Sequence, residues 1–281
     1  MSASSKTSSN TPSTSASRGR IWFDALAGVA STRPPVLSAD ADLAGETAQF
    51  ISVVPDPAQR FPRACDNVVG LEQGWKLAQA VRAVIEADAS ASLKRPIIAL
   101  VDVKSQAYGR REELLGLHLA CAAAVDAYAR ARLAGHPVIA LIVGPAMSGA
   151  FLAHGYQANR ILALDAPGTM VHAMGREAAA RVTRRSLEAL DALGETIIPM
   201  AYSMHAFNQL GLLSHLIQGV NADAPTSAEI DIVRQALSAA VADARLGPND
   251  LSGRLTSPAA QKNRAASIEV RRRLAQQWQA E

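Results

Sequence analysis

The sequence predicts an α/β fold, and three observations indicate it. Near-continuous apolar runs at residues 96–103 and 138–143 are typical of strands that are covered on both faces. A third apolar run follows at residues 160–165, and segments with helical spacing lie between the runs. This succession of strand, helix, strand, turn, helix and strand predicts a right-handed winding around a largely parallel sheet. Such sheets bind ligands beyond the carboxyl ends of their strands.

The chain before the first of these runs divides into four parts. Residues 1–19 are mostly Ser, Thr and Ala, and we predict a disordered tail because they bury too little apolar surface to offset the entropy of ordering. A short helix then begins around Trp22 and ends at Gly28. Residues 36–55 alternate with period two around a turn, which predicts a hairpin, and residues 71–88 repeat at helical spacing.

The remaining elements follow from the same patterns. An Ala-rich helix is predicted over residues 112–133, and residues 144–149 read as a turn before another helix. A short strand is predicted at residues 215–220. Further helices are expected at residues 178–192, 196–212, 229–246 and 258–281. Together these elements predict one domain over residues 20–281, with a helical C-terminal part.

Composition excludes several classes of protein. The 281 residues are 49% hydrophobic, which is enough to form a core, and no apolar run approaches the ~18 residues of a membrane span. The N-terminus lacks the apolar segment of a secretory signal, so we expect a cytoplasmic protein that does not enter a membrane. Cys65 and Cys121 match no ligand spacing, which favours reduced thiols and no metal site.

The net charge of +3 comes from the two ends of the chain. The body carries no basic stripe interleaved with aromatic residues, so nucleic acid is not an expected partner. The sequence has neither a Rossmann fingerprint nor a P-loop, so nucleotide binding has no support. Arg271, Arg272 and Arg273 form a basic run near the C-terminus. This run is interpreted as solvated surface or as a docking site for an acidic partner.

The first candidate site follows the strand that ends at Val103. The chain turns there through small and polar residues, so the backbone N–H groups of Ser105 and Gln106 could face a cleft above the edge of the sheet. Glu112 and Glu113 favour the N-terminus of the next helix. The alternative interpretation is an ordinary strand-to-helix loop with capping acids.

The second candidate site is the small-residue turn after the next strand. Gly149 and Ala150 fall where a helix begins, so their N–H groups lack intrahelical acceptors. Fixed donors of this kind form oxyanion holes. A Gly-Ala turn chosen only for packing is the alternative. Ser148 could act as a nucleophile, but His154 is poorly spaced to serve as its base, and the glycine pattern of a nucleophile elbow is incomplete.

The third candidate segment, residues 168–186, lies just beyond the third strand. It contains His172 between apolar neighbours and several arginines. Such a histidine is more often part of a cleft wall or core than an acid or base. The arginines could hold a carboxylate or phosphate, but a solvated helix face is the simpler interpretation of Arg176, Arg181, Arg184 and Arg185.

Several segments, taken in order, resemble the carboxyltransferase branch of the crotonase superfamily and, within it, the malonate decarboxylase gamma subunit family. The resemblance covers roughly residues 18–215. The matching segments are RIWFDALAG (20–28), FISVVPDPAQRFPRA (50–64), GLEQGWKLAQAV (70–81), SQAYGRREE (105–113), DAYARARLAGHPV (126–138) and HGYQANR (154–160). The resemblance implies a crotonase/ClpP-like spiral of β-strands and helices, of carboxyltransferase type.

The resemblance also implies an activity. A malonyl thioester carried on an acyl carrier protein loses its carboxyl group and becomes the acetyl thioester. The gamma subunit would pair with a beta subunit of the same fold, with the active site between them. No cofactor would be tightly bound to this chain, because the substrate is carried on the coenzyme-A-like phosphopantetheine arm of the carrier protein.

Carried over to this sequence, the implied donors are the backbone amides of Ser105, Gln106, Gly149 and Ala150. Decarboxylation leaves an enolate-like charge that such amides can stabilise. His154, Tyr156 and His172 are the candidates for a proton donor or for the cleft wall.

Two departures from the wider carboxyltransferase pattern concern biotin. Lys104-Ser105-Gln106 stands where those enzymes commonly have Pro-Gly-Phe, and Met147-Ser148 stands where they commonly have Tyr-Gly. Both departures favour a biotin-independent decarboxylase. Two alternatives stay open: a serine peptidase of the ClpP-like branch with Ser148 as nucleophile, and a non-catalytic partner subunit.

Overall fold

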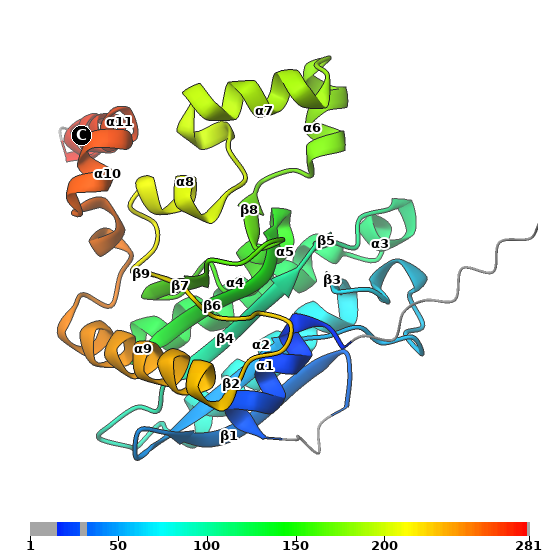
Figure 1. Cartoon of the computed structure of the whole chain (residues 1–281). Helices are drawn as coiled ribbons and strands as arrows, with labels where there is room; N and C mark the ends of the chain where they lie inside the picture. The colour runs from blue at the N-terminus through cyan, green and yellow to red at the C-terminus, as the bar shows by residue number, and fades with distance from the viewer. Residues whose placement is uncertain (1–15, 29–32, 280–281) are drawn as a thin grey trace, which may run out of the picture.

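The structure of the chain is a computed structural model that describes residues 16–28 and 33–279. Its centre is a twisted sheet that runs diagonally through the molecule (Figure 1). The strand order is β1-β2-β4-β6-β7-β9, with β8 paired to β6 and with β3 and β5 forming a separate pair. β1 is antiparallel to β2, and the other pairs are parallel. The strands are β1 Val36–Leu43, β2 Glu46–Val53, β3 Val68–Val69, β4 Ile97–Val103, β5 Ser105–Gln106, β6 Val138–Met147, β7 Arg160–Leu164, β8 Met170–His172 and β9 His215–Ile217.

Helices cover both faces of the sheet because its central strands are apolar on both sides. Every residue of β4 is buried, and alternate residues belong to different cores. Ile97, Ala99 and Val101 pack with α2 (Leu71–Ala87), α4 (Leu117–Leu133) and α5 (Ser148–Ala153). Ile98 and Leu100 pack with α1 (Arg18–Ala27) and α9 (Ser227–Leu246).

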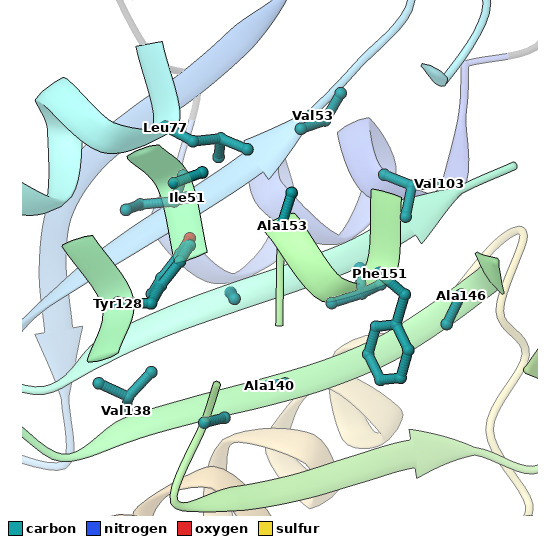
Figure 2. Packing of buried hydrophobic residues seen from close by; sticks show 14 of the residues in the cluster. Ile51, Val53, Leu77, Val103, Tyr128, Val138, Ala140, Ala146, Phe151 and Ala153 are labelled. Carbon is teal, nitrogen blue, oxygen red and sulfur yellow. The ribbon is translucent and has the colours of Figure 1, made fainter. Parts of the chain in front are cut away.

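The first of these cores supports the candidate site from below. Figure 2 shows Leu77 of α2 and Tyr128 of α4 converging on Ile51 and Val138 of the sheet. Phe151 of α5 packs in the same layer. The short helix that carries the candidate residues is therefore anchored in the core through its own apolar side chains.

The predicted sheet elements, the helix near 71–88 and the helix near 229–246 are confirmed. The tail was predicted to end at residue 19. This boundary is wrong, because α1 begins at Arg18 with Ser17 as its N-cap. Ser17 Oγ accepts a hydrogen bond from the amide of Arg20 at 3.3 Å. Residues 1–15 of the predicted tail lie outside the described residues.

Several predicted helices are each two elements. Residues 112–133 divide at Gly116, which has a φ of +87°, and residues 178–192 divide at Arg184, with a φ of +54°. Left-handed residues end a helix, and apolar spacing alone does not reveal them. The segment 196–212 contains only a 3₁₀ turn at Ile198–Met200 and a short helix. The elements are α3 Arg110–Leu114, α4 Leu117–Leu133, α6 Arg176–Thr183, α7 Leu187–Thr196, α8 Met204–Gln209, α10 Pro258–Asn263 and α11 Ala265–Gln279.

The predicted turn at 144–149 is mostly strand. β6 continues to Met147 because β8 pairs with its last three residues, Met147 lying opposite His172. The chain reverses only at Ser148, which has a φ of +57°. Within α2, the helical spacing of residues 71–88 would place Trp75 on the apolar face with Leu71 and Ala78, yet Trp75 is 46% exposed.

Two helical segments stand away from the sheet. α6 and α7 form an arm around Leu190, and α10 and α11 form another near the C-terminus (Figure 1). α11 has no buried residue. Among the described residues, no helix is both long enough and apolar enough to cross a membrane.

We predict that Gly74→Ala destabilises the protein. A β-carbon at Gly74 would lie 2.6 Å from the carbonyl oxygen of Ala120, so α2 and α4 would have to separate. Overpacking of this kind costs about 1–3 kcal/mol in the free energy of unfolding, which urea denaturation measures. Gly253→Ala is the matched control, because nothing lies within 4 Å of its added methyl group. Equal stability of the two variants would contradict the tight α2–α4 contact.

Candidate active site

A pocket of about 430 Å³ lies beyond the carboxyl end of β6. Ser148, Gly149, Tyr156 and His172 border it, and most of its remaining wall is apolar. The other lining residues are Phe151, Leu152, Val171, Ala173, Pro199, Met200, Ala201, Phe207 and Leu210. The pocket therefore lies where a parallel sheet is expected to bind a ligand. It combines a few polar groups with surroundings that weaken the solvation of a charge.

Ser148 and Gly149 belong to this wall and lie at the turn from β6 into α5. Ser148 is held in the left-handed region, which is unusual for a residue other than glycine and marks a tight reversal between β6 and α5. The Gly149 N–H is not free: it donates a hydrogen bond to the side-chain oxygen of Gln106 at 3.0 Å. Ala150 is completely buried and does not border the pocket.

The segment Ser105–Gln106 lies beside α5, as the predicted site requires. The Gln106 side chain, rather than an amide of this segment, makes the hydrogen bond to Gly149. β5 pairs with β3, which follows the loop after the hairpin. The Ser105 hydroxyl donates to the Gln106 carbonyl at 2.7 Å. Neither Ser105 nor Gln106 lines the pocket, so Gln106 reaches the site only through Gly149.

Asp102 fixes the spacing of β4 and β6 below the site, and the sequence analysis missed it. Its carboxylate is 4% exposed and accepts hydrogen bonds from the Gly19 amide at 3.0 Å and the Asn67 side chain at 2.8 Å. Burial raises its pKa, against the opposing effect of these donors and Arg18. A β-carbon at Gly144 would lie 2.3 Å from the Asp102 oxygen, so only glycine fits there. The sequence feature that could have identified Asp102 is an acidic residue within an otherwise apolar strand.

His154 is a core residue, which corrects its candidacy as proton donor or cleft wall. It is 0% exposed and does not border the pocket. Its Nε2 lies 2.9 Å from the Leu100 carbonyl, which can only accept, so Nε2 donates and Nδ1 accepts from the Tyr128 hydroxyl at 3.0 Å. Burial lowers the pKa of His154 to about 4. Both nitrogens are thus engaged with other core residues.

His172 borders the pocket as predicted. Its ring stacks on Tyr202 with centroids 4.0 Å apart, and its Nδ1 lies 3.1 Å from the Met174 carbonyl. Burial lowers its pKa, an effect that hydrogen bonds to backbone carbonyls oppose. The pairing of β8 with β6 places this histidine next to Met147, one residue before the reversal.

Tyr156 forms a second aromatic part of the pocket wall. Its ring meets Phe151 edge-on at 5.3 Å, and the Arg254 guanidinium lies over it at 5.0 Å. Tyr156 also borders a second pocket on the side of the C-terminal arm.

The arrangement has no nucleophile–base pair. Ser148 makes no hydrogen bond to a histidine within residues 16–28 and 33–279. The same residues contain no group of three or more His, Cys, Asp or Glu side chains placed to hold a metal ion. Cys65 and Cys121 are free thiols.

The fold is one that enzymes of the carboxyltransferase type share. At 18% identity, the transcarboxylase 12S structure with hydrolysed methylmalonyl-coenzyme A shows the same fold, with a TM-score of 0.59, over 82% of this chain and 40% of that one. The predicted crotonase-like carboxyltransferase fold is therefore confirmed.

Sequence comparison is more specific. The malonate decarboxylase gamma subunit family matches residues 64–278. Two Pseudomonas malonate decarboxylase structures, a hetero-tetramer with coenzyme A and an MdcD–MdcE hetero-dimer, are 55% and 53% identical with TM-scores of 0.88 and 0.86. In both comparisons 93% of this chain and 100% of the other are covered.

The chain belongs to the malonate decarboxylase gamma subunit family, which confirms the resemblance. A further relative, the malonyl-S-ACP:biotin-protein carboxyltransferase MADD of Malonomonas rubra, is 38% identical over 193 residues. That match covers 68% of this chain and 66% of the relative, just under two thirds.

We predict that His154 makes stability depend on pH. Its pKa is about 4 in the folded state and near 6.5 in the unfolded state. Between these two pH values the unfolded chain therefore binds a proton at His154 that the folded chain does not bind. Its contribution to stability is complete above pH 6.5 and declines as the pH falls to about 4, by about 3 kcal/mol. Urea unfolding at several pH values should show this slope.

The matched variant is His154→Gln, which cannot titrate. It should be less stable than the native chain at pH 7, because at least one buried hydrogen bond is lost, but its free energy of unfolding should change less between pH 6.5 and 4. An identical pH dependence of both proteins would refute this explanation.

Proposed function

We propose that this chain supplies one wall of the active site of a malonyl-thioester decarboxylase and that a beta subunit supplies the other wall. The substrate would be the malonyl thioester on the phosphopantetheine arm of an acyl carrier protein, and no cofactor would be tightly bound to this chain. Family membership and the hetero-oligomeric Pseudomonas relatives support this proposal. A cytoplasmic location stays a prediction.

The reaction needs little from side chains. The bond between the carboxyl carbon and the methylene carbon breaks, carbon dioxide leaves, and the electron pair moves into the thioester as an enolate. A proton added to the methylene carbon then gives the acetyl thioester. The Gly149 peptide at the wall of an apolar pocket is the observation on which the proposal depends, because an N–H there can stabilise developing negative charge while the pocket excludes water.

The hydrogen bond between Gly149 and Gln106 gives this mechanism a specific first step. A substrate oxygen can use the Gly149 N–H only after the Gln106 side chain has moved away. The net value of such a hydrogen bond is about 1 kcal/mol, so the exchange is inexpensive. Ser105, Gln106 and Ala150 stay proposed amide donors, and none of them faces the pocket described above.

The proton donor is proposed among the two remaining candidates. Tyr156 and His172 border the pocket, whereas His154 does not. Burial lowers the pKa of His172, which favours the neutral ring. A neutral imidazole can still relay a proton from water to the enolate carbon.

Release of the carboxyl group as free carbon dioxide, rather than its transfer to biotin, is also part of the proposal. Residues 104–106 and 147–148 depart from the pattern of biotin-using carboxyltransferases. The family's decarboxylase members support free carbon dioxide, whereas MADD is described as a biotin-protein carboxyltransferase. Full turnover in the presence of excess avidin would support the biotin-independent reaction, and its loss would contradict it.

The surface near the site suits a partner subunit. Leu114, Leu115 and Leu119 of the α3–α4 region are 78%, 55% and 58% exposed, close to the β5 segment. Exposed leucines grouped around one helix junction favour protein–protein contact. They support a hetero-oligomer in which this side of the site is covered.

The decisive variants are Ser148→Ala and Gly149→Val in the co-purified complex with a beta subunit. Ser148→Ala should keep decarboxylation within a few-fold, because every backbone amide survives. Gly149→Val should lower kcat about 100-fold or more, since a branched side chain would displace the peptide of this pocket-lining residue. The measurement is the rate of acetyl-thioester formation.

Each alternative has its own outcome in this assay. Loss of activity in Ser148→Ala would favour the nucleophile of a serine peptidase. An assembled Gly149→Val complex with the native rate would mean that this chain is a non-catalytic partner. Gel filtration of each variant complex provides the control for assembly.

We predict that Gln106→Ala lowers KM about five-fold and leaves kcat nearly unchanged. This variant removes the side chain that competes with substrate for the Gly149 amide. Substrate binding then no longer requires breaking that hydrogen bond, at a cost of about 1 kcal/mol. Gln106→Glu should have the opposite effect, since a carboxylate holds an N–H more strongly and repels a malonyl carboxylate. A large fall in kcat for Gln106→Ala would show that Gln106 instead contributes to the transition state.

A further inference from the structure

The second pocket, on the other side of the Tyr156 region, carries three guanidinium groups. It has a volume of about 360 Å³. It lies between the loop after α5, which carries Tyr156, and the C-terminal arm that contains α10 and α11. Arg254, Arg264 and Arg271 border it, and Asp250 is the one acid in its lining. Such an excess of positive charge in a concave site is unusual unless an anion neutralises it.

None of these three arginines has a carboxylate partner within 4 Å in the part of the chain that the structure describes. Their neighbours do have such partners. Arg272 and Arg273, next along α11, pair with Glu269 at 2.7 Å. In the run Arg271–Arg273, the last two arginines therefore pair with an acid on the surface, whereas Arg271 borders the pocket.

Arg254 is the most constrained of the three. Its Nε is buried without a hydrogen-bond partner, while one terminal nitrogen donates to the Ala158 carbonyl and the planar group covers the Tyr156 ring. Burial, together with the nearby charges of Arg132 and Arg264, lowers its pKa to about 10, so it stays charged at pH 7. A partly buried guanidinium without a carboxylate partner, and with its Nε unsatisfied, is costly unless an anion binds beside it.

We propose that this pocket, formed around Arg254, Arg264 and Arg271, binds a phosphoryl group. The forked guanidinium matches phosphate oxygens, and a dianion with three oxygens can engage three arginines where a single carboxylate would leave charge unpaired. The volume exceeds that of one phosphate ion, so the group is either free phosphate or the end of a larger organic phosphate. The proposal does not depend on the proposed reaction, because only Tyr156 is shared between the two pockets.

The test uses the complex with the beta subunit and titration calorimetry at pH 7 and low salt. Inorganic phosphate and 4′-phosphopantetheine are the probes, with acetate at equal ionic strength as the control for non-specific charge. We expect phosphate to bind at least ten-fold more tightly than acetate. Binding of both probes with equal affinity identifies free phosphate as the ligand, and tighter binding of the organic phosphate identifies the larger one.

The variants are Arg264→Gln and Arg271→Gln, each expected to weaken phosphate binding at least ten-fold. Arg271 lies on a helix without buried residues, so its replacement leaves folding intact. Arg272→Gln is the matched control on the same helix and should leave affinity unchanged. Phosphate binding that is no tighter than acetate binding, or that the two pocket variants do not weaken, would overturn the proposal.

Discussion

The candidate site depends on the close parallel pairing of β4 with β6. The register shifts between Val101 and Val103, at the level of Asp102, where the buried carboxylate faces Gly144. That carboxylate also ties in the start of α1 through Gly19 and the segment before β3 through Asn67. Because these links fix where each strand ends, they determine where the chain can turn at residues 104–106 and at 148–149.

The two turns meet as a consequence. α5 lies against β5, and the Gly149 amide reaches the Gln106 side chain across the gap between them. The apolar wall comes from elsewhere, since β8 brings His172 beside β6 and the segment before α8 brings Pro199 and Met200. A site of this construction needs several segments that are distant in sequence to be held by one sheet, which explains why so little of it consists of reactive side chains.

The sequence predicted the parts of the fold that depend on short-range periodicity. The buried strands follow from continuous apolar runs, the 36–53 hairpin from alternation of apolar residues, and the helices at 71–87 and 227–246 from apolar residues at helical spacing. The errors lie where a left-handed residue or a distant strand decides the outcome. Gly116 and Arg184 divide helices that look continuous, and the pairing of β8 extends β6 through a predicted turn.

The same distinction applies to the site. Gly149 and His172 were identifiable because each follows an apolar strand, and Tyr156 because it was a candidate proton donor; all three border the pocket. His154 has the same local setting, but its hydrogen bonds to Leu100 and Tyr128 come from other elements, so only the fold shows that it belongs to the core. The role of Gln106 and the unpaired state of Arg254 also depend on contacts across long stretches of sequence.

The central claim is that a main-chain N–H of this chain stabilises the charge formed when the malonyl group loses carbon dioxide. Replacement of Gly149 by glycolic acid tests it most directly, because the resulting ester lacks that single N–H and keeps every side chain. With the same replacement at Gly253 as the control, the account predicts that kcat of the intact complex falls about 100- to 1,000-fold only at position 149. An unchanged kcat in an assembled complex would contradict it.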